Sequence, residues 1–444
     1  MIRRSLVFLI LLLCHEAKHR TTGQNRAKIL LMFPMHVLFV LGFSTACSLL
    51  GDATLYTVLP THTADAGIAL SSVGLMLGMN RAVRILFNNL LGYANDRWPK
   101  KTLYIGSLCL GALSTLLYAT GGGFSLLLLG RVLWGISWSG IWVGGTTILL
   151  ESIHESKQGK ILGFYQTWFF LGTAFGALLG GYLTDRIGYR FTMLVGGGVT
   201  AFGALVAGLF LSSPVSGISK SQSNYSRALD PTSKEQLKTP DKRLNRLKLW
   251  TSAATYGINR FVFSGILSAT LAIFVRDSYQ TLLGIATFTG ILSAARTVIS
   301  MVCAPIAGWL ADRTRRSWTF LLAFLFLGSV GMFFMGVKSV ILASIGIVLG
   351  AAASGAIQTL TTNLTGLYTI PPKRGRDIGI MHTFGDVGSA LGPILAYAVL
   401  PSIGIQGIYM ISGIALLVFG SVIFLESILL RRFQKSTFLT RRNS

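Results

Sequence analysis

The sequence predicts an all-α membrane protein with twelve transmembrane helices in two pseudo-symmetric six-helix bundles, and three observations lead to this prediction. Hydrophobic residues make up 52% of the 444-residue chain, charged residues only 12%, and the mean hydropathy is +0.62, far above that of a soluble domain. Twelve apolar runs approach the twenty or so residues that a helix needs to cross the hydrocarbon of a bilayer. Motifs of the first half recur in the second half at a constant offset.

The repeat is clearest in a Gly-x-x-x-Asp-Arg pattern that occurs at residues 92–97 and again at 308–313, an offset of 216 residues. The same offset superposes the Gly-x-x-x-Gly pattern of 172–176 on that of 388–392. Because several motifs share one offset, we infer that a six-helix unit was duplicated.

The predicted helices follow one another with short connections, six on each side of a polar segment. They cover residues 31–58, 67–91, 102–120, 124–150, 160–182 and 191–212, and then 249–275, 281–309, 318–337, 339–369, 378–399 and 406–430. The polar segment is rich in Ser and Lys and predicts a flexible linker. Residues 1–30 begin like a signal peptide but lack a cleavage pattern, so we interpret them as an extended or interfacial start. The predicted divisions are 1–30 (N-terminal segment), 31–212 (first half), 213–247 (linker), 248–430 (second half) and 431–444 (tail).

Lys and Arg are distributed unequally between the two sides of the predicted membrane. If the N-terminus is cytoplasmic, segments on that side carry 30 of the 39 basic residues, and the opposite loops carry four. The positive-inside rule therefore predicts that both termini are cytoplasmic, in a multi-pass protein of the plasma or inner membrane. The net charge of +24 is then a topology signal, and without an aromatic-interleaved basic module we expect no nucleic-acid partner.

The twelve helices, the linker and the repeated loop motif together resemble the major facilitator superfamily over about residues 30–430. In that family the loop reads Gly-x-x-x-Asp-Arg/Lys-x-Gly-Arg/Lys-Arg/Lys. The first copy matches at Gly92, Asp96, Arg97, Lys100 and Lys101, and the second, one residue shorter, at Gly308, Asp312, Arg313, Arg315 and Arg316. The first copy has Pro99 in place of the second glycine. The resemblance implies a cytoplasmic gating motif that latches the inner face, with no part in substrate binding.

Two further family motifs are present in part. Arg131 and Gly135 match an Arg-x-x-x-Gly motif of the fourth helix. A glycine-rich pattern of the fifth helix, associated with exporters that exchange substrate for protons, matches at Gly172, Gly176, Gly180 and Gly181, with Ala177 where Pro is expected. The eleventh helix supplies the missing Pro393 but lacks the final glycine pair. The resemblance to proton antiporters is thus split between the repeats.

A carboxylate in the first helix is a candidate for proton coupling. Ser48, Asp52 and Tyr56 share one face at i, i+4 and i+8. A charge in mid-bilayer costs about 2.5–3.5 kcal/mol even on lenient scales, so its retention needs a partner or a water-filled cavity. In the family fold the first and fourth helices are neighbours, so Asp52 and Arg131 could form an ion pair that protonation breaks. The alternative is a static structural pair or a hydrated Asp52.

The eleventh helix offers a second coupling candidate. His382 and Asp386 lie one turn apart, which would suit a proton relay. The alternative is a hydrated inner-cavity residue or a partner for a buried arginine.

Several other polar and aromatic residues are candidates for lining a central substrate cavity. They are Arg81, Arg84, Trp138, Gln166, Arg260, Arg296, Gln358 and Asn363. One interpretation is a basic cavity for anionic or hydrogen-bonding solutes, and the other is that the arginines join helices by bonding to carbonyls. For Arg81 and Arg84 we favour one role of each kind. Sugars, drugs, organic anions and peptides all stay open as substrates.

The predicted function is secondary active transport of a small solute by alternating access, with proton-coupled efflux as the first choice. Proton-coupled uptake is the main alternative, and a transporter-like receptor is a third. The chain carries no phosphate-binding Gly-x-x-x-x-Gly-Lys loop, no nucleophile and base pair, and no paired cysteine spacing, so we predict no enzyme activity, cofactor or metal site. The expected partners are the solute, protons and lipid, and the expected state is a monomer.

Overall fold

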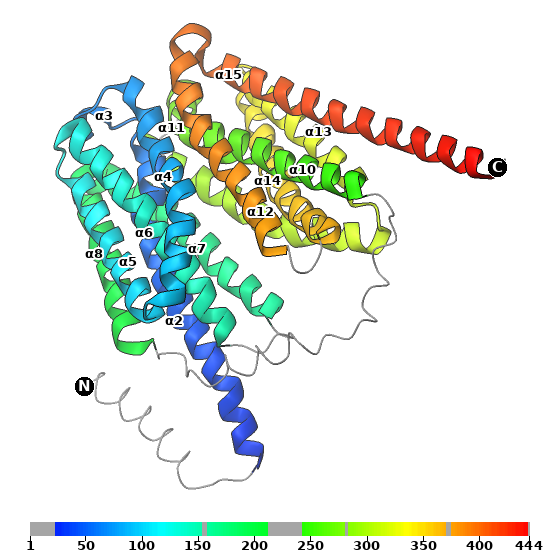
Figure 1. Cartoon of the computed structure of the whole chain (residues 1–444). Helices are drawn as coiled ribbons and strands as arrows, with labels where there is room; N and C mark the ends of the chain where they lie inside the picture. Colours follow the sequence, from blue (N-terminus) through cyan, green and yellow to red (C-terminus); the bar gives the residue numbers. More distant parts are fainter. Residues whose placement is uncertain (1–22, 153–157, 212–241, 280–282, 370–373, 443–444) are drawn as a thin grey trace.

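The computed structural model describes residues 23–152, 158–211, 242–279, 283–369 and 374–442 (Figure 1). Every regular element in these residues is a helix. The helices are α2 (Gly23–Val58), α3 (Thr63–Ala66), α4 (Leu70–Arg97), α5 (Lys100–Ala119), α6 (Gly123–Glu151), α7 (Gln158–Ile187), α8 (Tyr189–Phe210), α10 (Lys242–Asn259), η3 (Arg260–Leu267), α11 (Ser268–Ser278), α12 (Ile285–Thr314), α13 (Ser317–Gly336), α14 (Val340–Tyr368) and α15 (Arg374–Arg442). Most of the predicted N-terminal segment and linker lies outside the described residues.

The prediction of about twelve membrane-spanning helices is confirmed once α15 is read as two spans. Within the described residues, eleven helical stretches are long and apolar enough to cross a membrane, and one of them runs over Asp377–Glu426. Gly404 interrupts that stretch with a left-handed φ of 68°, which favours glycine. The seventh span combines α10, η3 and α11 and begins at Leu244, earlier than the predicted start at 249.

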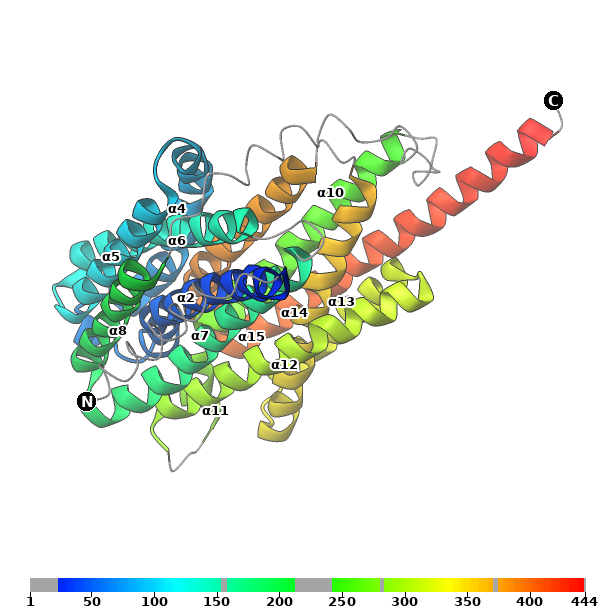
Figure 2. The ribbon, with the colours of Figure 1, turned by 90° about the horizontal axis from the view of Figure 1, so that it is seen from below.

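The helices form two bundles that lie side by side (Figures 1 and 2). The first half contains α2 to α8 and the second contains α10 to α15. Between the halves, α4 packs along α15 and α7 packs along α12. Each half has a separate apolar core, with Leu108 and Ile141 in the first and Leu325 and Leu360 in the second.

The duplicated Gly-x-x-x-Gly pattern presses the fifth helix of each half against the first helix of the same half. In the first half, a Cβ placed on Gly172 would lie 2.6 Å from the Cα of Ala46 in α2. In the second half, a Cβ on Gly388 would meet the backbone of Gly257 and Phe261, at the junction of α10 and η3. The repeat therefore encodes one packing contact twice.

Replacing Gly172 by valine is expected to lower the free energy of unfolding by about 1–3 kcal/mol, the usual effect of overpacking a tight contact. The backbone of Ala46 is the obstacle, and it moves only if α2 and α7 separate. Thermal unfolding of the purified protein in detergent measures the change. Gly198→Val is the matched control, because no atom lies within 4 Å of a Cβ at that position. Equal melting temperatures for the two variants would contradict the contact.

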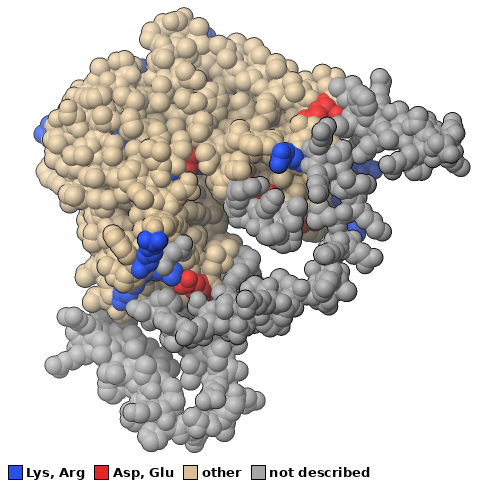
Figure 3. Space-filling model, viewed as in Figure 1, with Lys and Arg blue, Asp and Glu red and all other residues tan. Residues whose placement is uncertain are grey.

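The halves are in close contact at one end of the bundle and apart at the other. We call the linker end the one where α8 finishes at Phe210 and α10 begins at Lys242, and the far end its opposite. At the far end one buried apolar cluster contains residues of both halves, such as Met76 of α4 and Tyr397 of α15. Figure 3 shows the surface hollowed between the halves on the side of the linker end. The bundle is therefore closed at the far end and open at the linker end.

Candidate functional site

A cavity of 580 Å³ lies between the two halves, within the range of pockets that hold drug-sized ligands. Its charged lining residues are Asp52, Arg81, Arg84, Arg260 and Arg296. Red and blue atoms are visible inside the hollow in Figure 3. Of the other residues predicted to face the cavity, Trp138, Gln166 and Gln358 line it.

Asn363 is the predicted cavity residue that the structure places elsewhere. It is absent from the lining, and its side-chain nitrogen is 3.8 Å from a Cβ position on Gly308 of α12. Thr359, one turn earlier in α14, lines the cavity instead. The sequence did not determine where along α14 the cavity ends.

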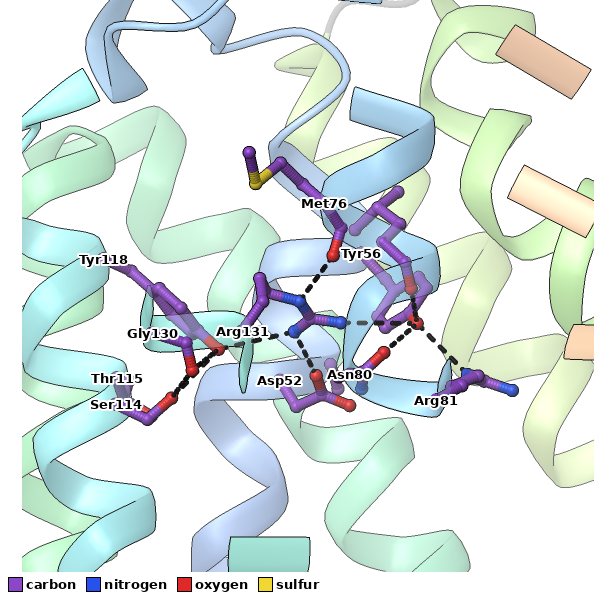
Figure 4. Close-up of polar contacts among 12 residues, drawn as sticks. Asp52, Tyr56, Met76, Asn80, Arg81, Ser114, Thr115, Tyr118, Gly130 and Arg131 are labelled. Atoms are coloured by element: carbon purple, nitrogen blue, oxygen red, sulfur yellow. Dashed lines mark hydrogen bonds and ion pairs between the residues drawn. The ribbon is translucent and has the colours of Figure 1, made fainter. Parts of the chain in front are cut away.

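Asp52 and Arg131 form an ion pair beside the cavity (Figure 4). The Arg131 Nη1 atom is 2.6 Å from Asp52 Oδ1, and the Arg131 side chain is fully buried while that of Asp52 is 15% exposed. Arg131 Nε also donates to the Met76 carbonyl oxygen at 2.8 Å. The carboxylate therefore has access to the cavity, while the guanidinium is held by the protein.

The glycine of the Arg131-x-x-x-Gly135 motif explains why α4 comes close enough for these contacts. A Cβ on Gly135 would lie 2.6 Å from the carbonyl oxygen of Asn80 in α4. Because glycine has no side chain, α6 packs directly on the α4 backbone. The Met76 carbonyl then lies within reach of Arg131, which is one helical turn before Gly135.

Tyr56 links the ion pair to a second arginine, a role that the sequence analysis did not assign. Its hydroxyl donates to the Leu77 carbonyl oxygen at 2.6 Å and accepts from Arg81 Nε at 3.2 Å and Arg131 Nη2 at 3.4 Å. Figure 4 shows both guanidinium groups directed at this hydroxyl. The sequence signal for this role was that Tyr56 lies one turn after Asp52 on the same polar face of the helix.

Arg84 and Asp386 form an ion pair between the halves, on α4 and α15. Arg84 Nη2 is 3.1 Å from Asp386 Oδ1, and Asn88 Nδ2 donates to Asp386 Oδ2 at 3.3 Å. The Asp386 side chain is only 7% exposed. The buried arginine considered as a partner for Asp386 is therefore Arg84. Arg84 joins α4 to α15, and both Arg84 and Arg81 line the cavity.

In the described part of the chain, neither a hydrogen bond nor an ion pair joins His382 to Asp386. The imidazole is exposed and packs edge-on against Tyr256 of α10, with ring centroids 5.6 Å apart. Asp386 instead faces α4. The two side chains leave α15 toward different helices, so the geometry gives the proposed relay no direct support.

Arg296 is held by an irregular turn of the seventh span. Its Nη2 atom donates to the Phe263 carbonyl oxygen at 3.1 Å and to Ser268 Oγ at 3.4 Å. Ser268 Oγ donates to the same carbonyl at 2.9 Å, across the wider spacing of the π-helix η3. A π-helix inside an α-helix is rare in proteins, and where one occurs it is often at a functional site. Arg260 is its first residue.

The contacts that the structure describes for the first gating motif lie within its own half. Lys100 Nζ is 3.2 Å from Glu151 Oε1 at the end of α6, and the Arg97 guanidinium lies 4.1 Å from the centroid of the Tyr93 ring. Lys101 lies in the first turn of α5. In the described structure no neighbouring helix packs closely on Gly92, because no atom lies within 4 Å of a Cβ placed there.

The glycine of the second gating motif packs against α14. A Cβ on Gly308 would lie 3.2 Å from Thr359 Cγ2 of α14. Arg315 ends α12 with a left-handed φ of 53°. Asp312, Arg315 and Arg316 are exposed, and Arg313 lies over the Trp309 ring. Within the described residues, no ion pair of either motif reaches the other half.

Comparisons with known proteins agree on one family. Residues 41–282 and 249–442 match the family described as Major Facilitator Superfamily. The multidrug resistance protein MdtG of Proteus mirabilis is 23% identical over 84% of this chain and 91% of that protein. The quinolone resistance protein NorA of Staphylococcus aureus is 25% identical over 85% of this chain and 94% of that protein. A bacterial homologue of the human lysosomal transporter Spinster, solved inward-facing and occupied, shares the fold with a TM-score of 0.70 at 16% identity over 90% and 97%.

Proposed function

Because the chain belongs to the major facilitator superfamily, we propose that it is a secondary active transporter that moves a small solute across the membrane by alternating access. The observation that carries this proposal is the cavity between the halves, which is lined by both of them. It is closed at the far end by the shared apolar cluster and open at the linker end. Rocking of the halves about the cavity would expose it to each side in turn.

The open end faces the cytoplasm in our proposal. The support is the charge distribution, since 30 of the 39 basic residues fall on the linker side. Both gating motifs lie at this end, and among their described side chains no ion pair reaches the other half, as expected of a latch when the end that it closes is open. We propose that they engage when the cavity opens to the outside.

Export is the direction that we favour. MdtG and NorA are named as resistance proteins, and both align along most of their length. The glycine-rich fifth helix, with Gly172 and Gly176 against α2, also resembles that of proton-exchanging exporters. Together these features favour export of the solute in exchange for protons.

Asp52 is the carboxylate that we propose couples transport to protons. It lines the cavity, so protons reach it from the open end. Protonation would remove its charge and break the contact with Arg131. Arg131 would stay in place because the Met76 carbonyl also holds it. Protonation thus changes the charge of the cavity while the helices stay packed.

Uptake together with protons is the second candidate, favoured by the charge of the cavity. Its lining has four arginines and one carboxylate. A proton on Asp52 makes the lining more positive, so proton and negatively charged solute would favour each other and move in the same direction.

The test is gradient-driven transport in vesicles containing the purified full chain. Pools of cell-derived solutes are supplied outside, and solutes accumulated inside are identified by mass spectrometry. Exchange for protons predicts accumulation when the lumen is acidic, whereas movement with protons predicts accumulation when it is alkaline. In Asp52→Asn the gradient-dependent part is expected to fall at least about tenfold, since the coupling group no longer titrates.

Asp65→Asn is the matched control, because Asp65 is an exposed carboxylate at the far end, away from the cavity. It should transport like the unaltered protein. Full gradient-driven transport in Asp52→Asn would remove the coupling proposal. Binding of a ligand without flux of any solute would favour a receptor.

A further inference from the structure

The arginines around the cavity outnumber the carboxylates that neutralise them. Two pairs are balanced, Arg131 with Asp52 and Arg84 with Asp386. The remaining cavity arginines are Arg81, Arg260 and Arg296, and within the described residues none of the three has a carboxylate within ion-pair distance. Isolated charges are expensive inside a membrane, so three unpaired cations at one cavity need an explanation.

Unused hydrogen-bond donors lie on two of these three side chains. Arg81 Nη1 and Arg296 Nε are buried and have no hydrogen-bond partner in the described structure, and the same holds for Arg84 Nε. The partners that Arg81 and Arg296 do have are neutral oxygens of Tyr56, Phe263 and Ser268. Buried donors are nearly always satisfied in folded proteins, so these groups point to a missing acceptor.

We propose that the transported solute is an amphipathic organic anion whose acidic group binds among Arg81, Arg260 and Arg296. This inference rests on the proposed transport function and names the substrate class of the same cavity. An acidic group supplies negative charge to all three cations and acceptor atoms for the unused N–H groups of Arg81 and Arg296. Charge-assisted bonds from guanidinium to such a group are among the stronger hydrogen bonds in proteins.

Part of the cavity lining is apolar and aromatic. Trp134, Trp138, Phe169 and Phe170 form this part. The Trp134 and Trp138 rings are stacked with centroids 6.1 Å apart, and Phe169 lies 5.7 Å from Trp138. With 580 Å³ of space, the cavity is larger than an inorganic anion needs. A solute with an acidic group and an aromatic body would fill both parts.

The unpaired cations come from both halves of the protein. Arg81 belongs to α4 of the first half, and Arg260 and Arg296 belong to η3 and α12 of the second. An anion that contacts Arg81 and Arg260 offsets the repulsion between these two cations of opposite halves. Its binding therefore favours approach of the halves around the cavity, the movement that alternating access requires.

Binding of three matched probes to the purified full chain in phosphatidylcholine nanodiscs tests the charge preference. The probes share a naphthalene ring and carry permanent or no charge: naphthalene-2-sulfonate, naphthalene-2-sulfonamide and 2-naphthyltrimethylammonium. The sulfonate is expected to bind at least about tenfold more tightly than the ammonium probe, because only the sulfonate complements the arginines. Equal or tighter binding of the ammonium probe, or no saturable binding of the sulfonate, overturns the proposal.

Charge-removing variants locate the site. Arg81→Gln, Arg260→Gln and Arg296→Gln should each weaken sulfonate binding about tenfold or more and change sulfonamide binding little. Arg296→Lys should retain most of the sulfonate affinity because it keeps the charge. Arg276→Gln is the control, since Arg276 is an exposed residue paired with Asp277 outside the cavity. Unchanged sulfonate affinity in all three glutamine variants contradicts the assigned site, and sulfonamide binding in each variant reports that it is folded.

Failure of this inference is distinguishable from failure of the transport proposal. Gradient-driven flux of neutral or cationic solutes, without flux of anions, keeps the transporter and removes the anion preference. Arginine-dependent sulfonate binding without flux of any solute keeps the site and removes transport.

Discussion

Replacing Arg131 by methionine is expected to lower the free energy of unfolding by about 3–5 kcal/mol and to abolish solute transport. The substitution leaves the Asp52 carboxylate without its partner and the Met76 carbonyl without the donor from Arg131 Nε. The Arg131 side chain is fully buried, so water cannot replace its contact with the Met76 carbonyl without repacking α4 and α6. Thermal unfolding in detergent and gradient-driven transport in vesicles measure the two effects.

The double variant Asp52→Asn with Arg131→Met separates an unpaired charge from a loss of packing. It should regain part of the lost stability, because no carboxylate is then left alone, but it should not regain coupled transport. Arg276→Met removes an exposed pair with Asp277 and should change stability by less than about 1 kcal/mol. If Arg131→Met unfolds at the same temperature as the unaltered protein, the network is not structural.

Replacing Asp185 by alanine is expected to weaken the closure of the far end. The population of molecules in which this end is open should rise roughly tenfold. Asp185 in the last turn of α7 accepts from the backbone N–H and the hydroxyl of Thr287, both at 2.6 Å. Thr287 lies in the first turn of α12, so one carboxylate of the first half caps a helix of the second. A helix cap contributes about 0.5–2 kcal/mol, and 1.4 kcal/mol corresponds to a tenfold change in population.

Reaction of a single engineered cysteine with a membrane-impermeant maleimide measures this opening. In a background with the four native cysteines replaced by serine, Ala286→Cys places the thiol in the buried far-end cluster. Its reaction should accelerate about tenfold in Asp185→Ala and less in Asp185→Asn, which keeps an acceptor oxygen. Asp65→Ala removes another exposed carboxylate of the far end and should have no effect. An unchanged rate in Asp185→Ala would show that the cap does not hold the far end closed.

The sequence predicted best those features of the site that depend on residues close together in the chain. The polar face of α2 follows from helical spacing, and it placed Asp52 and Tyr56 correctly on one side of the helix. The contact of Asp52 with Arg131 was anticipated only through the family resemblance, since 79 residues separate the two. The part played by Tyr56 was missed because its place on the polar face does not show which side chains its hydroxyl contacts.

The contacts between the halves could not be predicted from the sequence, for a different reason. Asp386 and His382 are one turn apart, yet Asp386 pairs with Arg84 in α4 while His382 packs on Tyr256 in α10. Which neighbour each meets depends on the rotation of α15 about its axis, and that rotation is set by packing across the whole bundle. The π-helix η3 had no sequence signal, although it helps to position Arg296.

The sequence by itself determined that this protein spans a membrane with two related six-helix halves. Hydrophobicity and span length act along the chain, and an offset of 216 residues is visible in one dimension. Only the tertiary structure decided which cations keep a carboxylate and which do not. Arg131 and Arg84 are paired, while Arg81, Arg260 and Arg296 face the cavity without one. That division arises from contacts between helices far apart in the chain. Whether a charged side chain in a membrane has a partner depends on which helices pack beside it.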